Sequence, residues 1–352
     1  MDDVWEIAGI SVPFAAGVAA GVSLRPPPSA ALVLASVLIM TALWRRNRSG
    51  LLLYPLLFLS AGIFCGALSC LPAAGKQWHL QTAQSACTYL KGVIDRVPFR
   101  NEETGALLKA LMTGDRSSLS RETVLVFRSS GASHILALSG LHLGFIYLFI
   151  SKAFSFLGNS PVSRRTRCFC IIAAAGFYTL MTGAGPSIVR AFLFITIREI
   201  SKIASGRAQE PGRTLLLCLT VQLALDPAVI VSVGFQLSYL AMCGIIFLLP
   251  HLQSWYPEGV RWDPMRYIWN AAALAISCQA FTAPLSWIKF HTFPKYFLLT
   301  NILALPLVSA LMMLAMTVVV LSVPDICPHF LVSALEHCTS ILLWLLGTIS
   351  SM

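Results

Sequence analysis

Residues 129–151 read SSGASHILALSGLHLGFIYLFIS, and these 23 residues include no Lys, Arg, Asp or Glu. A helix of this length can cross a hydrocarbon layer about 30 Å thick. The first half of the stretch nevertheless contains polar and small residues, namely His134, Ser139, Gly140 and His142. An imidazole inside a bilayer is costly unless it faces protein or water. The stretch is therefore predicted to be a span that lines a site or a pathway.

The spacing of the two histidines constrains what they can do together. In a continuous helix, His134 and His142 would lie about 12 Å apart along the axis and roughly 80° apart in projection, too far for one metal ion. A break at Ser139-Gly140 would bring them closer, and a broken helix at membrane depth must face protein or water. Gly140 and Gly144 also form a GxxxG step, which predicts the close approach of another helix.

The composition of the whole chain indicates a multi-pass membrane protein. Hydrophobic residues make up 57% of the chain and charged residues 11%, and the mean hydropathy is +0.75. Soluble domains have about 25% charged residues, so a soluble core is excluded as the main interpretation. The N-terminal residues MDDVWE lack the basic region of a secretory signal, so we expect the first span to be retained. Most of the ten cysteines lie in or beside apolar runs, while a Cys70–Cys87 disulfide is left open.

The predicted fold is an all-α bundle of about nine to eleven transmembrane helices, with broken or re-entrant helices and short amphipathic extracytoplasmic helices. Gly9, Gly17 and Gly21 are predicted close-packing positions in the first span. The runs at 186–203 and 213–225 are alternatively re-entrant or interfacial, because one contains charges and the other is short. The candidate spans are residues 7–24, 29–44, 51–71, 129–151, 168–183, 186–203, 213–225, 230–249, 267–288, 296–323 and 330–349.

Basic residues in the loops orient the chain in a cytoplasmic (inner) membrane. With the N-terminus in the cytoplasm, thirteen basic residues fall in inner loops and three in short outer loops, as the positive-inside rule requires. The inner residues are Arg45, Arg46, Arg48, Lys152, Arg164, Arg165, Arg167, Arg198, Lys202, Arg207, Arg213, Arg261 and Arg266. The outer residues are Arg25, Lys289 and Lys295.

The interval 76–128 is then extracytoplasmic, although it carries eight basic and five acidic residues. Leucines at helical spacing predict a short amphipathic helix at 104–113, and Ser120 is expected to cap a second one. These helices would lie on the bilayer or against the bundle. The surplus positive charge is either an ordinary solvated surface or a face for an anionic polymer or lipid head groups. We therefore predict three regions: a three-span region at 1–75, this amphipathic segment at 76–130, and a channel domain at 131–352.

A second motif joins two apolar runs. Residues 182–187 read TGAGPS, where glycines permit a sharp reversal and Pro186 suits the first turn of a helix. Arg190 follows one turn later, so the helix start and the guanidinium together suit a phosphate, unless Arg190 simply snorkels to the interface. Among later polar residues, Asp226 is expected to cap the next helix, and Gln236 to hydrogen-bond between helices.

Several chemistries are disfavoured by missing motifs. The sequence has neither the G-x-x-x-x-G-K-[ST] pattern of nucleotide motors nor the H-E-x-x-H pattern of metalloproteases. Ser139 with His142 is a poor match to an intramembrane serine protease, whose base comes from a separate helix. We therefore expect no enzymatic activity, no metal and no cofactor.

Five blocks of sequence resemble the competence domain of the ComEC family, whose members take DNA into transformable bacteria. The resemblance extends over residues 105–319. The blocks are LLKALMTGDR (107–116), SHILALSGLH (133–142), LMTGAGPS (180–187) with Arg190, Asp226-Pro227 followed by SVGFQLS (232–238), and NILALPLV (301–308).

The resemblance implies a channel that passes single-stranded DNA inward through the cytoplasmic membrane. A separate ATP-driven motor and a DNA receptor would be partners, and the chain would be a homo-oligomer or a monomer. Channel-lining and DNA-contacting positions would be His134, Ser139, Gly140, His142, Gly183, Gly185, Ser187, Arg190 and Gln236. Supporting positions would be Asp115, Arg116, Asp226, Ser238 and Asn301.

The chain departs from the family pattern in two ways. Residues 72–103 are about half as long as the five-stranded barrel that members usually carry outside the membrane. An H-x-H-x-D metal motif, expected in the metallo-β-lactamase-like domain that often follows, is absent from the sequence. We expect a compact or truncated member that relies on partners. A transporter or flippase for another anionic solute, or a non-transporting scaffold, remains an alternative.

Overall fold

The computed structural model describes residues 2–27, 53–69, 78–154, 158, 160–256, 263–291, 295–324 and 326–351. Helices are the only regular secondary structure within these ranges, which confirms the predicted all-α fold. The same ranges contain five helices long and apolar enough to cross a membrane, so the chain is a multi-pass membrane protein. These five are Val4–Leu24, Val233–Ser254, Pro264–Phe290, Phe297–Ser322 and His329–Ser350.

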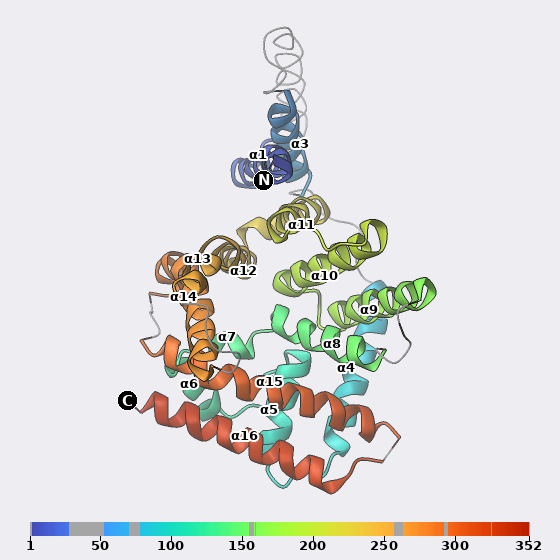
Figure 1. Ribbon diagram of the computed structural model, residues 1–352, viewed down its shortest axis with the longest axis vertical. Coiled ribbons are helices and arrows are strands. Elements are labelled where there is room, and N and C mark those ends of the chain that lie inside the picture. The colour runs from blue at the N-terminus through green and yellow to red at the C-terminus, as the bar shows by residue number, and fades with distance from the viewer. Residues whose placement is uncertain are drawn as a thin grey trace. The chain divides into compact units, whose positions relative to one another are not determined.

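Figure 1 shows the helices that the structure describes. They are α1 (Asp2–Leu24), α3 (Leu53–Ser69), α4 (Trp78–Arg96), α5 (Glu102–Thr113), α6 (Arg121–Ser129), α7 (Ser133–Leu136), α8 (Gly140–Ala153), α9 (Pro161–Met181), α10 (Pro186–Ser205), α11 (Pro211–Leu225), the 3₁₀ helix η3 (Pro227–Val231), α12 (Val233–Cys243), the π-helix η4 (Gly244–Leu248), α13 (Leu249–Ser254), α14 (Pro264–Phe290), α15 (Phe297–Ser322) and α16 (His329–Ser350). Ten of the eleven predicted spans overlap these helices, while the run at 29–44 lies outside the described residues.

The chain forms two compact units, and each is discontinuous in sequence. The first comprises Met1–Trp78 and Val189–Ser238, and the second comprises His79–Ile188 and Tyr239–Met352. The domain limits that we predicted follow expected membrane position and not compactness, so they stay a prediction.

Glycine packing joins α1 to α3 in the first unit. A Cβ atom on Gly17 would lie 2.1 Å from the Leu59 carbonyl oxygen, and one on Gly62 would lie 2.2 Å from the Phe14 carbonyl oxygen. Gly21 and Gly66 continue the two glycine rows one turn further along each helix. The backbones therefore approach as closely as small residues allow in membrane helix pairs. The predictions for Gly17 and Gly21 are confirmed.

The prediction for Gly9 is wrong. A Cβ atom on Gly9 would meet no atom of the described residues within 4 Å. Gly9 lies two turns before Gly17 on α1, beyond the part of the helix that the Gly62 and Gly66 row reaches.

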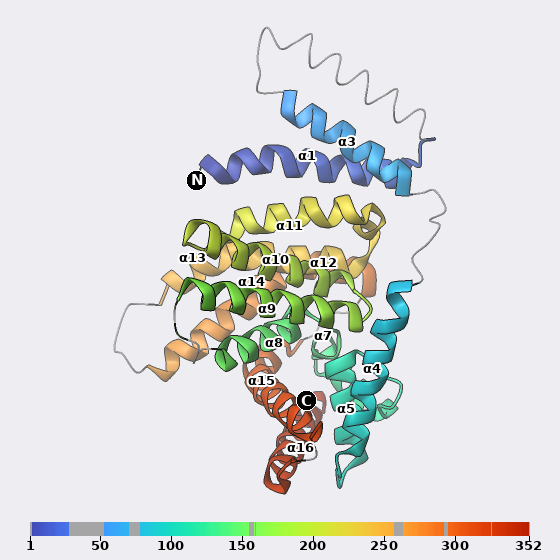
Figure 2. The same ribbon diagram turned by 90° about the vertical axis from the view of Figure 1, so that its right-hand side faces the viewer.

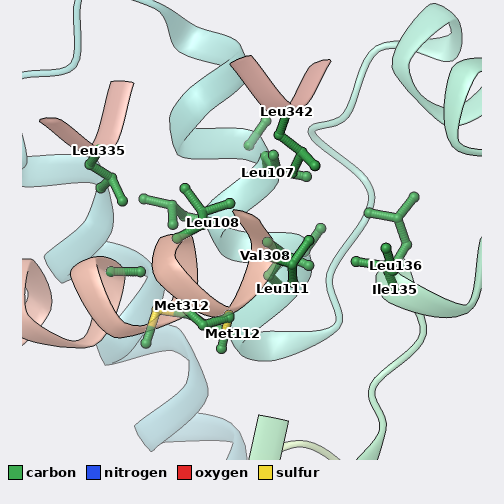
Figure 3. Close-up of a cluster of buried hydrophobic side chains, with 14 of the residues drawn as sticks. Leu107, Leu108, Leu111, Met112, Ile135, Leu136, Val308, Met312, Leu335 and Leu342 are labelled. Carbon is green, nitrogen blue, oxygen red and sulfur yellow. The ribbon is translucent and has the colours of Figure 1, made fainter. Parts of the chain in front are cut away.

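In the second unit, α5 lies at the centre of the hydrophobic core. Side chains of α5 gather with those of α7, α15 and α16, as Figure 3 shows for Leu107, Leu108, Leu111, Met112, Ile135, Leu136, Val308, Met312, Leu335 and Leu342. Leu107, Leu108 and Leu111 are at most 1% exposed. Of the two placements that we predicted for this helix, the structure supports packing against the bundle. The preceding polar stretch is also helical, as α4.

Two caps expected or implied by the sequence are present on these helices. The Asn101 side chain accepts a hydrogen bond from the Glu103 backbone N–H at the start of α5. Ser120 accepts one from the Thr123 N–H at 3.1 Å, which confirms the predicted start of α6. Such caps satisfy backbone donors that the first turn of a helix leaves free.

The predicted span at 230–249 is interrupted. It divides into η3, α12 and the π-helix η4, followed by α13. At the π-turn, a Cβ atom on Gly244 would lie 2.1 Å from the Ser277 carbonyl oxygen of α14, so this turn packs tightly onto α14. Single π-turns of this kind change the direction in which the following side chains point.

The glycine packing can be tested with one substitution at two positions. We expect Gly62→Ala to lower the melting temperature by a few degrees, since overpacking a close contact costs about 1–3 kcal/mol. Gly9→Ala adds the same methyl group in open space and raises helix propensity by up to about 1 kcal/mol, so its melting temperature should equal or exceed the wild-type value. Thermal unfolding of the purified protein in detergent measures both. Equal effects at the two positions would contradict the packing.

Candidate functional site

The stretch at 129–151 is not one helix, so the prediction of a single continuous span is wrong. The predicted alternative, a break at Ser139-Gly140, is what the structure contains (Figure 2). α7 has only four residues, and α8 begins at Gly140. Between them the backbone is extended, with φ −77° and ψ 128° at Ala137 and φ −131° and ψ 173° at Ser139.

Side chains satisfy the backbone groups that this break exposes. The Ser139 N–H donates to His142 Nδ1 at 3.1 Å, and the Leu141 N–H donates to Ser139 Oγ at 3.3 Å. The two residues thus form a capping box in which histidine stands where Glu or Gln is usual. The His142 side chain is buried. The contact of Ser139 with His142 is therefore a helix cap.

The hydrogen bonds also fix which ring nitrogen of each histidine carries the proton. His134 Nδ1 lies 3.2 Å from the Gly131 carbonyl oxygen, which only accepts, so Nδ1 donates and Nε2 of the neutral ring is an acceptor. His142 Nδ1 accepts from a backbone N–H, so Nε2 carries the proton and donates. The two imidazoles therefore present unlike atoms, one acceptor and one donor.

Arg116 bridges the first two blocks of the resemblance. Its Nε and Nη2 atoms both donate to the Leu136 carbonyl oxygen, at 3.2 and 2.8 Å, and this carbonyl ends α7. Gly114 ends α5 with a φ of +79°, and the Leu138 side chain packs directly against it. The end of α5 and the broken helix are thus held together by a polar and an apolar contact.

Two further elements contact the same region. The Tyr178 hydroxyl of α9 donates to the Met112 carbonyl oxygen at 2.9 Å. The Thr300 hydroxyl of α15 donates to the Ser130 carbonyl oxygen at 2.6 Å. Asn301 follows Thr300, and its side chain contacts His134, while its buried Oδ1 atom has no well-formed hydrogen bond within the described residues. Four of the blocks that resemble the family therefore contribute contacts to this region, either through their own residues or, for Tyr178 and Thr300, through residues next to a block.

One residue that holds α5 in place was not predicted from the sequence. Glu336 is the only acidic residue of α16, and its Oε1 atom accepts hydrogen bonds from the backbone N–H groups of Arg100 and Asn101. It thereby fixes α16 to the start of α5. A lone carboxylate in an apolar span was the available signal, because such groups need a specific partner.

Two ion pairs connect α4 with α5 and the turn that follows it. Lys91 Nζ lies 2.5 Å from Asp115 Oδ2, and Lys109 Nζ lies 2.5 Å from Asp95 Oδ1. The hydrogen bond from Lys91 holds the pKa of the Asp115 carboxyl well below its usual range, and the same bond raises the pKa of Lys91. Two of the basic residues of this segment are therefore neutralised within the hairpin of α4 and α5.

The TGAGPS motif makes a sharp turn, as predicted. Gly183 and Ala184 both have positive φ values, +82° and +51°. The Gly183 N–H donates to the Leu180 carbonyl oxygen at 3.1 Å and the Ala184 N–H to that of Thr179 at 2.8 Å, which is the Schellman ending of a helix. Pro186 then begins α10, as expected. Gly185 has a negative φ. The second residue with a positive φ in this turn is therefore Ala184 and not the second glycine.

Arg190 belongs to the first unit and is 9% exposed. Its Nη1 atom donates to the Ser238 carbonyl oxygen, so two of the resembling blocks, one with Arg190 and one with Ser238, are joined within this unit. Arg190 is therefore packed inside the protein and does not snorkel to an interface. Ser187 is half-buried in the first turn of the same helix.

Three expectations for other positions are wrong. No atom of the described residues lies within 4 Å of a Cβ on Gly144, so helix packing does not extend to that step of the GxxxG. Asp226 occupies the cap position of η3, but its side chain makes no capping bond. Gln236 Nε2 donates to the Ile230 carbonyl oxygen of η3 at 2.8 Å, which is a bond within the predicted span at 230–249 and not between two spans. The predicted Cys70–Cys87 pair involves Cys70, which lies outside the described residues.

A metal site is not evident in the described part of the chain, since no three His, Cys, Asp or Glu side chains gather there. The chemical capacity of the region is hydrogen bonding. It consists of the ring atoms of His134 and His142 and the Asn301 carboxamide.

Comparison with known proteins identifies similar chains. Residues 111–352 match the model of the family described as Competence protein. "Uncharacterized protein YcaI" of Escherichia coli (strain K12) is 27% identical over 248 residues, which are 68% of this chain and 32% of that protein. "ComE operon protein 3" of Bacillus subtilis (strain 168) is 24% identical over 205 residues, which are 58% of this chain and 25% of that protein. "Competence protein ComA" of Neisseria gonorrhoeae is 28% identical over 180 residues, with shares of 48% and 25%.

This chain therefore spans about a quarter to a third of the length of the curated relatives it matches. No solved structure matches it.

The capping role of His142 can be separated from any other role of its ring. We expect His142→Gln to keep the melting temperature near the wild-type value, because a glutamine at this position also accepts the Ser139 N–H. His142→Leu should cost about 1 kcal/mol, since it leaves that N–H without its partner. Thermal unfolding in detergent compares the two variants. A glutamine variant as unstable as the leucine variant would argue against the capping box.

The Lys91–Asp115 pair predicts a small dependence of stability on pH. Because the folded-state pKa of Asp115 is lowered, its contribution is full above the ordinary aspartate value and is lost as the pH falls below about 4. The raised pKa of Lys91 makes its contribution full below about pH 10 and lost above it. About a third of each side chain is exposed, so the pair contributes less than about 1 kcal/mol.

Asp115→Asn removes the pair while keeping the side-chain size. We expect this variant to melt slightly lower than the wild type at pH 7 and to lose less stability as the pH falls from 5 to 2. Melting curves across that range measure the difference. Parallel pH profiles for the two proteins would show that the pair does not contribute.

Proposed function

This chain belongs to the competence protein family, and from that premise we propose that it passes single-stranded DNA through the cytoplasmic membrane during DNA uptake. The N-terminus would lie in the cytoplasm, and the segment of α4 to α6 outside. The sequence lacks the G-x-x-x-x-G-K-[ST] motif of nucleotide motors. We therefore propose that a separate motor supplies the energy and that a separate receptor delivers the DNA.

The observation that carries the proposal is the interrupted helix at α7 and α8. Every nucleotide brings a phosphate charge, which hydrocarbon does not accept. A path for such a polymer needs hydrogen-bonding groups at membrane depth, and a broken helix can exist there only where it faces protein or a water-filled cavity. The break offers such groups while its own backbone is satisfied by Ser139, His142 and Arg116.

The position of the proton on each imidazole decides whether its Nε2 atom donates or accepts a hydrogen bond. His142 Nε2 carries a proton, so it suits a phosphate oxygen or a base acceptor. His134 Nε2 is an acceptor in the neutral ring, so it suits a base amino group or water, and it donates to phosphate only after protonation. In the other unit, Arg190 of α10 carries a positive charge that suits a phosphate.

These donors would also serve another anionic solute, which is the second candidate function. Arg190 favours it, because it lies near the start of α10 and carries a positive charge that suits a small anion. The two candidates differ in the size of the solute that crosses.

Two measurements test the proposal. Deletion of the gene should abolish entry of labelled DNA into the cytoplasm while DNA binding at the cell surface persists, and the intact gene should restore entry. In liposomes that contain the purified chain, a fluorescent single-stranded oligonucleotide should cross faster than in empty liposomes. Release of a small organic anion without any release of oligonucleotide would favour the second candidate. Normal DNA entry in the deletion strain would overturn the proposal.

A further inference from the structure

One guanidinium reaches from the α4–α5 hairpin to the broken helix. Leu136 is the last residue of α7, and the final carbonyls of a helix have no partner within it. An unsatisfied carbonyl inside a membrane protein is costly. Arg116 meets this need with two N–H groups, at 3.2 and 2.8 Å, although it lies 20 residues earlier in the chain.

Arg116 is held from both sides by fixed elements. Gly114 ends α5, whose leucines are fully buried in the core. Asp115 accepts hydrogen bonds from Lys91 of α4 and from the Ser117 N–H at 3.0 Å. The backbone around Arg116 is therefore anchored to both helices of the hairpin, so the position of the guanidinium is set by the hairpin.

The contact of Leu138 with Gly114 adds a second link between the same two segments. Gly114 has a positive φ, which a side chain would strain, and a Cβ there would lie 2.5 Å from Leu138 Cδ1. The Leu138 side chain thus fills the space that glycine leaves. Leu138, two residues after α7, and Gly114, the residue after α5, are packed together beside the bond from Arg116 to Leu136.

We infer that Arg116 is a positioning residue, which holds the break between α7 and α8 in the shape that places Ser139 and His142. Its guanidinium acts by geometry, since it points two N–H groups at one protein carbonyl, and not by attracting DNA with its charge. A lysine ammonium does not reproduce this fork, because it is a compact charge on a flexible stem. The effect on transport rests on the proposed function, whereas the structural effect does not.

The chain offers a matched control for charge. Arg121 is exposed at the start of α6, in the same extracytoplasmic segment, and it makes no ion pair or side-chain hydrogen bond in the described residues. Arg121→Gln and Arg116→Gln remove the same charge from the same segment. A role in attracting a polyanion predicts similar losses in both, whereas a positioning role predicts a loss only at Arg116.

The test measures hydrogen exchange of the backbone amides of Ser139 and Leu141 in the purified full chain. We expect Arg116→Gln to speed their exchange about tenfold, which corresponds to the loss of one hydrogen bond to a charged group. Arg116→Lys should behave in the same way, and Arg121→Gln should exchange like the wild type. DNA entry, measured in cells, should fall in both Arg116 variants and stay unchanged in Arg121→Gln.

Two results would overturn the inference. One is unchanged exchange at Ser139 and Leu141 in Arg116→Gln, and the other is wild-type exchange and transport in Arg116→Lys. If Arg116→Gln does not accumulate, the lysine variant, which keeps the charge and the aliphatic stem, decides alone. Absence of DNA transport by the wild-type chain would overturn the proposed function, while the exchange result would still decide the role of Arg116.

Discussion

A membrane helix that is interrupted must satisfy its freed backbone groups from within the protein, and this requirement organises the second unit. Around the break, the backbone groups of Ser139, Leu141 and Leu136 bond to the side chains of His142, Ser139 and Arg116 respectively. In lipid these groups would have no alternative partner. The break therefore exists only because particular side chains from two separate segments of sequence, one with Arg116 and one with Ser139 and His142, converge on it.

The same requirement changes how the polar residues of the motifs are interpreted. His134, Ser139 and His142 were predicted to line a pathway because polar groups are expensive in an apolar span. Part of their capacity serves the backbone instead, since Nδ1 of each ring bonds to the main chain. The proposed contact with a solute would use Nε2 of each ring. The structural role and the proposed role thus divide between two atoms of one side chain.

Glycines and charges link segments in complementary ways. Between α1 and α3, four glycines let the backbones touch, so dispersion and weak polar contacts hold the pair. Between α4 and α5, two ion pairs and the buried leucines of α5 hold the hairpin, while Glu336 fixes α16 to it. The apolar core of α5, α15 and α16 and these polar contacts stabilise the same arrangement.

The sequence alone determined the helical membrane fold, most helix positions, the family resemblance, the cap at Ser120 and the turn before Pro186. These properties follow from local composition and spacing, which the chain carries at every point. Only the tertiary structure decided that Gly62 and Gly66 face Gly17 and Gly21, that a Cβ on Gly9 or Gly144 would meet none of the described residues within 4 Å, and that Arg116 reaches Leu136. These are contacts between distant segments, and a hydrogen-bonding side chain shows no preference for its partner until packing brings one within reach.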